Sequence, residues 1–171
     1  MAEVLRLADF DSCLRFVMVG CGPFPAAALL VRDATAVPQI IALDVDESAA
    51  ATARRVVEAM GEHRIHVSCA DGALYDFAGA QIVYLANQVC GKDRVLARID
   101  ETAASAVVVV REPYGIGRLF AEEVAPKLPA RFRVATRGAG CAPFFSRHVL
   151  LSRAGDGERG DPISESRERR S

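Results

Sequence analysis

The chain has 171 residues, 51% of them hydrophobic, and its 21 basic and 22 acidic residues leave a formal net charge of −1. This length suits one well-packed domain, which we place at residues 1–153, and is too short for two ordinary domains. Because the charges nearly cancel and no Lys/Arg cluster lies in that range, we expect a small-molecule substrate and no nucleic-acid or membrane partner. The composition leaves open whether the protein is a homodimer.

The sequence predicts neither a membrane span nor a secretory signal. No apolar stretch approaches the roughly 20 residues needed to span a bilayer, and the first residues lack the basic and apolar parts of a secretory signal. We therefore expect a cytoplasmic protein. The five cysteines form no CxxC pair and are expected to be reduced thiols. His63, His66 and Cys69 lie three apart, but this spacing alternates faces on a strand, so we expect no metal site.

Short apolar runs alternate with segments of helical pattern along most of the chain. Continuous Val/Ile runs indicate parallel strands that helices bury on both faces. The predicted fold class is therefore α/β, a Rossmann-like, doubly wound and mostly parallel sheet. The five strands expected in its parallel part, each followed by a turn and a helix-like segment, are residues 16–19, 40–43, 65–67, 82–85 and 106–110.

The last part of the chain follows a different pattern. Residues 116–128 look helical, whereas residues 132–136 and 147–152 are predicted to form an antiparallel hairpin that closes the sheet. Residues 154–171 are too polar to bury and are predicted to be a disordered tail. Earlier in the chain, the clearest helix is predicted at Glu47–Met60, which is acidic at its start and followed by glycine.

The first candidate site lies in Phe16–Pro25, a buried strand that ends in a G-x-G turn. Glycines let the backbone bend sharply and approach a ligand closely, and proline suits the start of a helix. Pro25 stands where a dinucleotide fingerprint would have its third glycine, which favours a cofactor without a pyrophosphate. The residues of this turn that we expect to bind the cofactor are Gly20, Cys21, Gly22 and Pro23.

Two acidic motifs follow the second and third strands. Asp44 comes about twenty residues after the glycine turn, as expected for a carboxylate that binds ribose hydroxyls, with Val45 beside it and Asp46 beginning the next helix. Asp71 and Gly72 follow the third strand, where Asp71 can reach an adenine amino group. An Asp-Gly pair that only forms a turn is the alternative for this second motif.

The motifs VMVGCGPFP, ALDVDES, CADG and QIVYLANQV resemble, in this order and spacing, those of class I S-adenosylmethionine-dependent methyltransferases. The resemblance covers residues 14–153 and implies S-adenosylmethionine as cofactor or group donor, with no metal. Within that superfamily the chain is most similar to the catalytic domain of nicotianamine synthases. The segments that carry this similarity are GCGPFP, DVDESAAATARR, IVYLANQVCGKDRVLARI, REPYGIGR and FFSRHVLLSR.

The second resemblance implies a different reaction from methylation. Nicotianamine synthase-like enzymes transfer the 3-amino-3-carboxypropyl group and release methylthioadenosine. The related azetidine-2-carboxylate synthases close the cofactor's own α-amine on the same carbon. Nicotianamine synthases have an N-terminal helical domain that covers the active site, whereas only about fifteen residues precede the first strand here. We therefore expect action on the cofactor itself or on one small amine. Removal of an upstream domain from this sequence is the competing explanation. An ordinary methyltransferase and a catalytically inactive cofactor-binding subunit remain the alternatives.

Few side chains are candidates for catalysis. Asn87, just past the fourth strand, is expected to contact the cofactor and to accept a hydrogen bond from its amine, which needs only modest desolvation to be neutral. Tyr114 is the second candidate, as a hydroxyl acceptor or as an aromatic face for the sulfonium. A turn role is the alternative for Asn87, and surface packing is the alternative for Tyr114. Tyr84 would serve only if it points into the cleft. Arg111 and Glu112 end the fifth strand, close enough in principle to bind the methionine carboxylate or amine, but the alternative that we expect for them is a solvated strand end.

Overall fold

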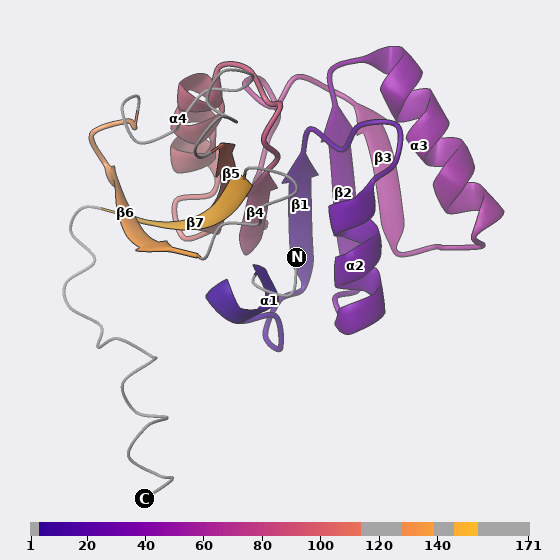
Figure 1. Ribbon diagram of the computed structural model, residues 1–171, viewed down its shortest axis with the longest axis horizontal. Helices are drawn as coiled ribbons and strands as arrows, with labels where there is room; N and C mark the ends of the chain where they lie inside the picture. The colour runs from indigo at the N-terminus through magenta and orange to yellow at the C-terminus, as the bar shows by residue number, and fades with distance from the viewer. Residues whose placement is uncertain (1–3, 114–127, 139–145, 154–171) are drawn as a thin grey trace, which may run out of the picture.

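The structure is a computed structural model that describes residues 4–113, 128–138 and 146–153. One sheet runs through it, with helices packed on either side (Figure 1). The elements in chain order are α1 (Val4–Leu7), β1 (Arg15–Val19), α2 (Ala26–Ala34), β2 (Gln39–Asp44), α3 (Glu47–Ala59), β3 (Ile65–Cys69), β4 (Ile82–Leu85), α4 (Lys92–Thr102), β5 (Val107–Pro113), β6 (Phe132–Arg137) and β7 (Ser146–Arg153).

The strands follow the order β3-β2-β1-β4-β5-β7-β6. The first five are parallel to one another, and β7 pairs antiparallel with both β5 and β6. The predicted fold class and the closing antiparallel hairpin are therefore confirmed. The chain leaves β1 toward β2 on one side and later returns to β4 on the other. In open α/β sheets, such a switch point opens a crevice beyond the carboxyl ends of the strands.

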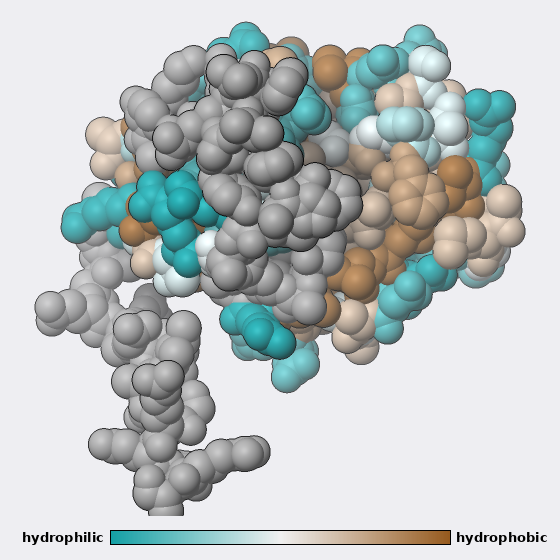
Figure 2. Space-filling model, viewed as in Figure 1, coloured by the Kyte–Doolittle hydropathy of each residue, from teal (hydrophilic) through white to brown (hydrophobic). Residues whose placement is uncertain are grey.

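Alternate residues of the central strands pack into two separate cores. Phe16 and Met18 of β1 face the side covered by α2 and α3, whereas Val17 and Val19 face the side covered by α4. All four side chains are at most 5% exposed, which explains why β1 reads as a continuous apolar run. In the part of the surface that Figure 2 leaves free of grey atoms, hydrophobic side chains gather over α2.

The connection between β3 and β4 differs from the expectation. Residues 70–81 contain turns and no helix, so the prediction of a helix after every strand is wrong at this point. Asp71 and Asp76 each accept a hydrogen bond from the backbone N–H two residues further on, at 2.8 and 3.0 Å. Aspartates that bond to their own backbone in this way stabilise turns at the expense of helix.

Several expectations concern residues outside the described part of the chain. They are the helix at residues 116–128, of which only the last residue is described and is not helical, the tail at residues 154–171 and the side chain of Tyr114. Within the described part, no helix has the length and apolar character needed to cross a membrane.

An ion-pair cluster joins α2 to the start of β3. The backbone N–H of Arg64 donates to Glu62 Oε1 at 2.6 Å, and the Arg32 guanidinium lies 3.2 Å from Oε2. These contacts lower the pKa of Glu62, and the backbone hydrogen bond from Arg64 has the largest effect. Burial acts in the opposite direction. A carboxylate with a lowered pKa stabilises the fold above its unfolded-state pKa, and this stabilisation is lost as the pH falls through the folded-state pKa.

Glu62→Gln should therefore destabilise the protein at neutral pH and have a smaller effect in acid. Urea unfolding at pH values above and below the ordinary glutamate pKa of about 4.3 measures the difference. Asp33→Asn is the control, because Asp33 pairs with Arg32 while its side chain is 64% exposed, and exposed pairs contribute little. A Glu62→Gln deficit that stays constant with pH would contradict this account.

Candidate cofactor site

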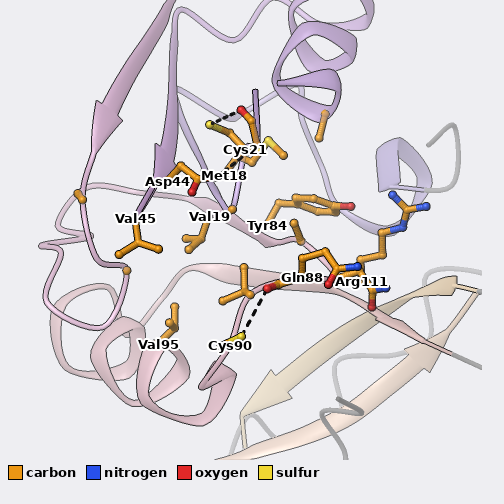
Figure 3. Close-up of a pocket in the computed structure, with 18 of the residues that line it drawn as sticks. Met18, Val19, Cys21, Asp44, Val45, Tyr84, Gln88, Cys90, Val95 and Arg111 are labelled. Atoms are coloured by element: carbon orange, nitrogen blue, oxygen red, sulfur yellow. Dashed lines mark hydrogen bonds between the residues drawn. The ribbon is translucent and has the colours of Figure 1, made fainter. Parts of the chain in front are cut away.

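A cleft of about 670 Å³ lies at the carboxyl ends of the parallel strands (Figure 3). Its volume falls in the range of small-molecule sites. Residues that follow β1, β2, β3 and β4 line it, together with the first turns of α2 and α4 and residues of β5 and β7. The polar side chains along it belong to Cys21, Asp44, Asp71, Tyr84, Asn87, Gln88, Cys90, Arg94, Arg111 and Ser146.

The glycine turn after β1 is held by its neighbour β2. The backbone N–H groups of Gly20 and Cys21 both donate to the carbonyl oxygen of Leu43, at 2.8 and 2.9 Å. Gly20 has φ +79°, and a Cβ built on it would lie 2.6 Å from a methyl group of Val89. Gly22 has φ +63° but faces open space, because a Cβ at this residue would have no neighbouring heavy atom within 4 Å. The first glycine is therefore fixed by packing and the second leaves room for a ligand.

Asp44 joins the second motif to the first. Its Oδ2 accepts a hydrogen bond from the Gly22 N–H at 2.7 Å, and its Oδ1 accepts one from the Asp46 N–H at 3.0 Å. Each carboxylate oxygen can accept a further bond, so the side chain can still receive ribose hydroxyls. Asp46 caps α3 as expected, because its side chain accepts from the N–H groups of Ser48 and Ala49.

The rim of the cleft near Asp44 is apolar. Val45 is 72% exposed and Phe24 is 60% exposed, and both line the cleft. Large apolar side chains exposed at a cleft suit contact with a flat ring. Cys21 also lines the cleft, but its thiol donates to the Gly22 carbonyl. Burial raises the pKa of that thiol to about 12, and the negative charge of Asp44 contributes a smaller part of this rise. Pro23 is exposed and lies outside the lining.

Asp71 and Gly72 line the cleft, and both stabilise the turn that follows β3. Asp71 Oδ1 accepts from the Ala73 N–H at 2.8 Å, so the turn-forming alternative for this pair describes part of its role. A Cβ on Gly72 would lie 2.7 Å from Val19 and 3.4 Å from Val95. Gly72 is therefore the residue that lets the turn after β3 approach β1 and α4.

Asn87 is positioned to receive a hydrogen bond from a ligand. It follows β4, lines the cleft, and has a buried Oδ1 atom without a hydrogen-bond partner among the residues described. A buried acceptor that stays unpaired costs about 1–3 kcal/mol, so this atom is suited to accept a hydrogen bond from a molecule bound in the cleft. The structure therefore identifies Oδ1 as the atom of Asn87 that could accept the hydrogen bond expected from the sequence.

Lys92 holds the loop that carries Asn87. Its side chain is 5% exposed, and Nζ donates to the carbonyl oxygens of Asn87 at 2.7 Å and Val89 at 2.9 Å. The sequence offered no signal for this role, since a lysine in the first turn of a helix normally points to solvent.

Lys92→Met should lower the free energy of unfolding by about 1–3 kcal/mol, because it removes both of these hydrogen bonds and leaves the carbonyls of Asn87 and Val89 to find other partners. It should also weaken ligand binding by loosening Asn87. Urea unfolding and calorimetric titration measure the two effects. Lys92→Arg keeps the charge and the donors, so it should recover part of both losses. Normal stability together with normal ligand affinity in Lys92→Met would contradict the role of Lys92 in holding this loop.

A polar cluster lies at the β5 side of the cleft. Tyr84 pairs with Val109 across β4 and β5, and Arg111 pairs with His148 across β5 and β7, so these side chains share one face of the sheet. Arg111 Nε donates to Ser146 Oγ at 2.8 Å. The ring centroids of Tyr84 and His148 are 6.0 Å apart. Figure 3 shows the Tyr84 side chain directed toward Arg111.

The expectation of a solvated strand end at Arg111 and Glu112 is wrong. Arg111 lines the cleft, and Glu112 is 1% exposed, with Oε1 located 2.8 Å from Arg147 and 3.4 Å from Arg137. Both arginines come from strands that join the sheet after β5, far along the chain. Burying a carboxylate is costly unless it is paired in this way.

Metal-ligating side chains do not cluster in the part of the chain that the structure describes. No group of three or more His, Cys, Asp or Glu residues there could hold an ion. His63, His66 and Cys69 are all exposed, and the last two lie on β3 at the edge of the sheet.

No family profile matches the sequence, and no curated protein sequence does either. Solved structures match the fold. An E81Q mutant of MtNAS, a nicotianamine synthase, in complex with S-adenosylmethionine has 19% identity and a TM-score of 0.79 over 90% of this chain and 60% of that one. The mitomycin 7-O-methyltransferase MmcR has 21% identity and a TM-score of 0.72, over 89% and 52%. An S-adenosylmethionine-dependent methyltransferase from Aquifex aeolicus has 14% identity and a TM-score of 0.65, over 88% and 87%.

The chain therefore has the fold of the class I S-adenosylmethionine-dependent methyltransferases. Within that fold it is similar to the nicotianamine synthase MtNAS, and it spans about 60% of the length of that protein.

Proposed function

We propose that the chain binds S-adenosylmethionine in this cleft and catalyses attack on the aminocarboxypropyl carbon, with release of methylthioadenosine. The attacking group is the α-amine of the same molecule, which gives azetidine-2-carboxylate, or the nitrogen of one small amine. The observation that carries the proposal is the buried, unpaired Oδ1 of Asn87 at the cleft, because it calls for an N–H donor. MtNAS, which shares the fold, has been crystallised with S-adenosylmethionine and with MTA and tNA.

The side chains along the cleft fit the parts of this molecule. The carboxylate of Asp44 suits ribose hydroxyls, the exposed Val45 offers an apolar contact for adenine, and Asp71 lies beside the end of β3. The open space at Gly22 lets the ligand approach the backbone of the glycine turn. Toward β4 and β5, the donors and acceptors of Asn87, Tyr84 and Arg111 suit the amino-acid arm.

The ligand supplies a sulfonium with electrophilic carbons, so the protein has to position and shield the reactants rather than activate a poor leaving group. A new nitrogen–carbon bond forms, the carbon–sulfur bond breaks with its electron pair going to sulfur, and the surplus proton leaves the nitrogen for solvent. Asn87 Oδ1 accepts an N–H of the amine and so directs the nitrogen lone pair toward the carbon. Burial in the cleft lowers the pKa of the amine from its ordinary value of about 8.

Asn87→Ala should lower turnover roughly a hundredfold, because misplacing a tethered nucleophile by about 1 Å costs this much. Purified protein is incubated with S-adenosylmethionine alone and then with a panel of small amines, and the products are measured by mass spectrometry. We expect methylthioadenosine with azetidine-2-carboxylate, or with an aminocarboxypropyl amine, above the level of a protein-free control. Asn87→Asp keeps an acceptor oxygen at this position and should retain more activity than Asn87→Ala.

Two outcomes would contradict the proposal. One is S-adenosylhomocysteine formed only with an added acceptor, which is the product of methyl transfer. The other is methylthioadenosine formation that Asn87→Ala leaves unchanged. Methylthioadenosine affinity serves as the folding control, because this ligand lacks the amine that Asn87 is proposed to contact.

A small-molecule methyltransferase is the second candidate. It is favoured by the structural likeness to MmcR and to the O-methyltransferase NcsB1, which matches with a TM-score of 0.69 at 20% identity. The glycine turn, Asp44 and Asp71 serve either reaction, because they lie where the nucleoside is expected and not where the attacked carbon is. The product measurement above separates the two functions.

A further inference from the structure

The geometry points to the cluster of Tyr84, Arg111 and Ser146 as a carboxylate-recognition subsite for the amino-acid end of S-adenosylmethionine. This inference rests on the proposed function and deepens it. It makes the three residues determinants of specificity for a sulfonium that carries a carboxylate.

The carboxylates of the cleft lie far from Arg111. Asp44 and Asp71 come from the ends of β2 and β3, whereas Arg111 comes from β5 and the other arginine of the lining, Arg94, comes from α4. Since β1 and β4 lie between β2 and β5, Asp44 and Arg111 are three inter-strand spacings apart, about 14 Å. A ligand with hydroxyls at one end and an anionic group at the other complements this arrangement. A nucleoside joined to an amino acid is such a ligand.

Arg111 is held in place for this role. Its Nε donates to Ser146 Oγ at 2.8 Å, and Ser146 is 3% exposed. This bond fixes the Nε edge of the guanidinium, a planar fork whose shape matches the two oxygens of a carboxylate. Pairing across the sheet fixes the position of Ser146 as well, because it lies opposite Pro113 at the start of β7.

Tyr84 adds a neutral donor. Its side chain is buried at 2% exposure, yet it lines the cleft. Burial raises the pKa of the Tyr84 hydroxyl to about 12, although the neighbouring Arg111 acts in the opposite direction. The phenol therefore keeps its proton at any physiological pH. When the guanidinium donates to the phenolic oxygen, the O–H group is left to donate to an anion.

The test compares three ligands by calorimetric titration: S-adenosylmethionine, its decarboxylated form, and methylthioadenosine, which lacks the whole arm. The unmodified protein should bind S-adenosylmethionine about ten- to hundredfold more tightly than the decarboxylated form, since hydrogen bonds to a charged group are worth this much. Arg111→Met should reduce this ratio to near one while the affinity for methylthioadenosine stays the same. Tyr84→Phe, which keeps the ring, should reduce the ratio by a smaller factor.

Arg94→Met is the matched control. Arg94 also lines the cleft, but it comes from the first turn of α4, and its removal should leave the ratio unchanged. Arg111→Lys keeps the charge without the fork and should give an intermediate ratio, which separates recognition from a failure to fold.

Three results would overturn the inference. The first is equal affinity of the unmodified protein for the two sulfonium compounds. The second is a ratio that Arg111→Met leaves intact, as expected if Arg111 contacted only the carboxylate of a second substrate. The third is loss of the ratio in Arg94→Met instead. Binding of methylthioadenosine in any of these cases would leave the proposed cofactor site standing, whereas absence of binding by all three ligands would overturn that site and this inference together.

Discussion

Gly20→Ala should abolish S-adenosylmethionine binding and lower the free energy of unfolding by about 2–5 kcal/mol. Two costs add up. An alanine at φ +79° is strained by about 1–2 kcal/mol, and its Cβ would lie 2.6 Å from a methyl group of Val89. Relief of this clash has to move Val89, which lies two residues after Asn87 in the loop that Lys92 holds. The substitution therefore damages both sides of the cleft.

Two other glycines separate these costs. Gly22 and Gly61 both have φ +63°, and neither has any heavy atom within 4 Å of the Cβ position. Gly22→Ala and Gly61→Ala should each cost about 1–2 kcal/mol of stability, because only backbone strain is added. Gly22→Ala should also weaken binding, since its methyl group enters the cleft, whereas Gly61→Ala should leave affinity unchanged.

Urea unfolding and calorimetric titration of the three glycine variants measure both effects. If Gly20→Ala were no less stable than Gly61→Ala, the close packing of the turn against Val89 would be wrong. If Gly22→Ala bound the ligand normally, the glycine turn would lie outside the site.

Asp44→Asn should weaken S-adenosylmethionine binding about ten- to hundredfold and lower the free energy of unfolding by about 1–3 kcal/mol. The carboxylate accepts from the N–H groups of Gly22 and Asp46 on its two oxygens. An asparagine has one acceptor oxygen, so one of these N–H groups would face an NH2 group instead. The hydrogen bond from Gly22 or the one from Asp46 would therefore be lost, and the ribose would lose a charged acceptor.

Asp46→Asn is the matched control for this prediction. It neutralises an aspartate two residues away whose Oδ1 accepts from Ser48 and Ala49 at the start of α3. Asparagine caps helices as well as aspartate does, so stability and affinity should change little. Equal losses of affinity in the two variants would indicate a general effect of charge and contradict a direct role for Asp44.

The central part of the fold could be predicted from the sequence because its strands are buried on both faces. The run Phe16–Val19 packs into two cores at once, and the predicted boundaries of β1, β2 and β4 differ from the observed ones by at most one residue at either end. The segment between β3 and β4 could not be predicted in this way. Its helix-like composition is overridden by Asp71 and Asp76, which bond to the backbone of their own turns.

One part of the candidate site could also be predicted from the sequence, and another part could not. Gly20, Asp44 and Asn87 lie at the end of a strand or within two residues of it, so their place at the cleft could be inferred from strand order alone. The cluster at Arg111 depends on β7, whose Ser146 is 35 residues away in sequence and reaches Arg111 only through antiparallel pairing. Tyr84 could be assigned to the same face as Arg111 only once the register of β4 and β5 was known. The register of two strands depends on how both of them pack, so the residues around Tyr84 do not reveal it by themselves.

A crystal structure of the protein grown with saturating S-adenosylmethionine tests the central claim most directly. The account predicts the ribose on Asp44, the adenine beside Val45, and the amino-acid arm between Asn87 Oδ1 and the Arg111 guanidinium. An empty cleft at saturating ligand, or a ligand bound at another place on the molecule, would contradict it.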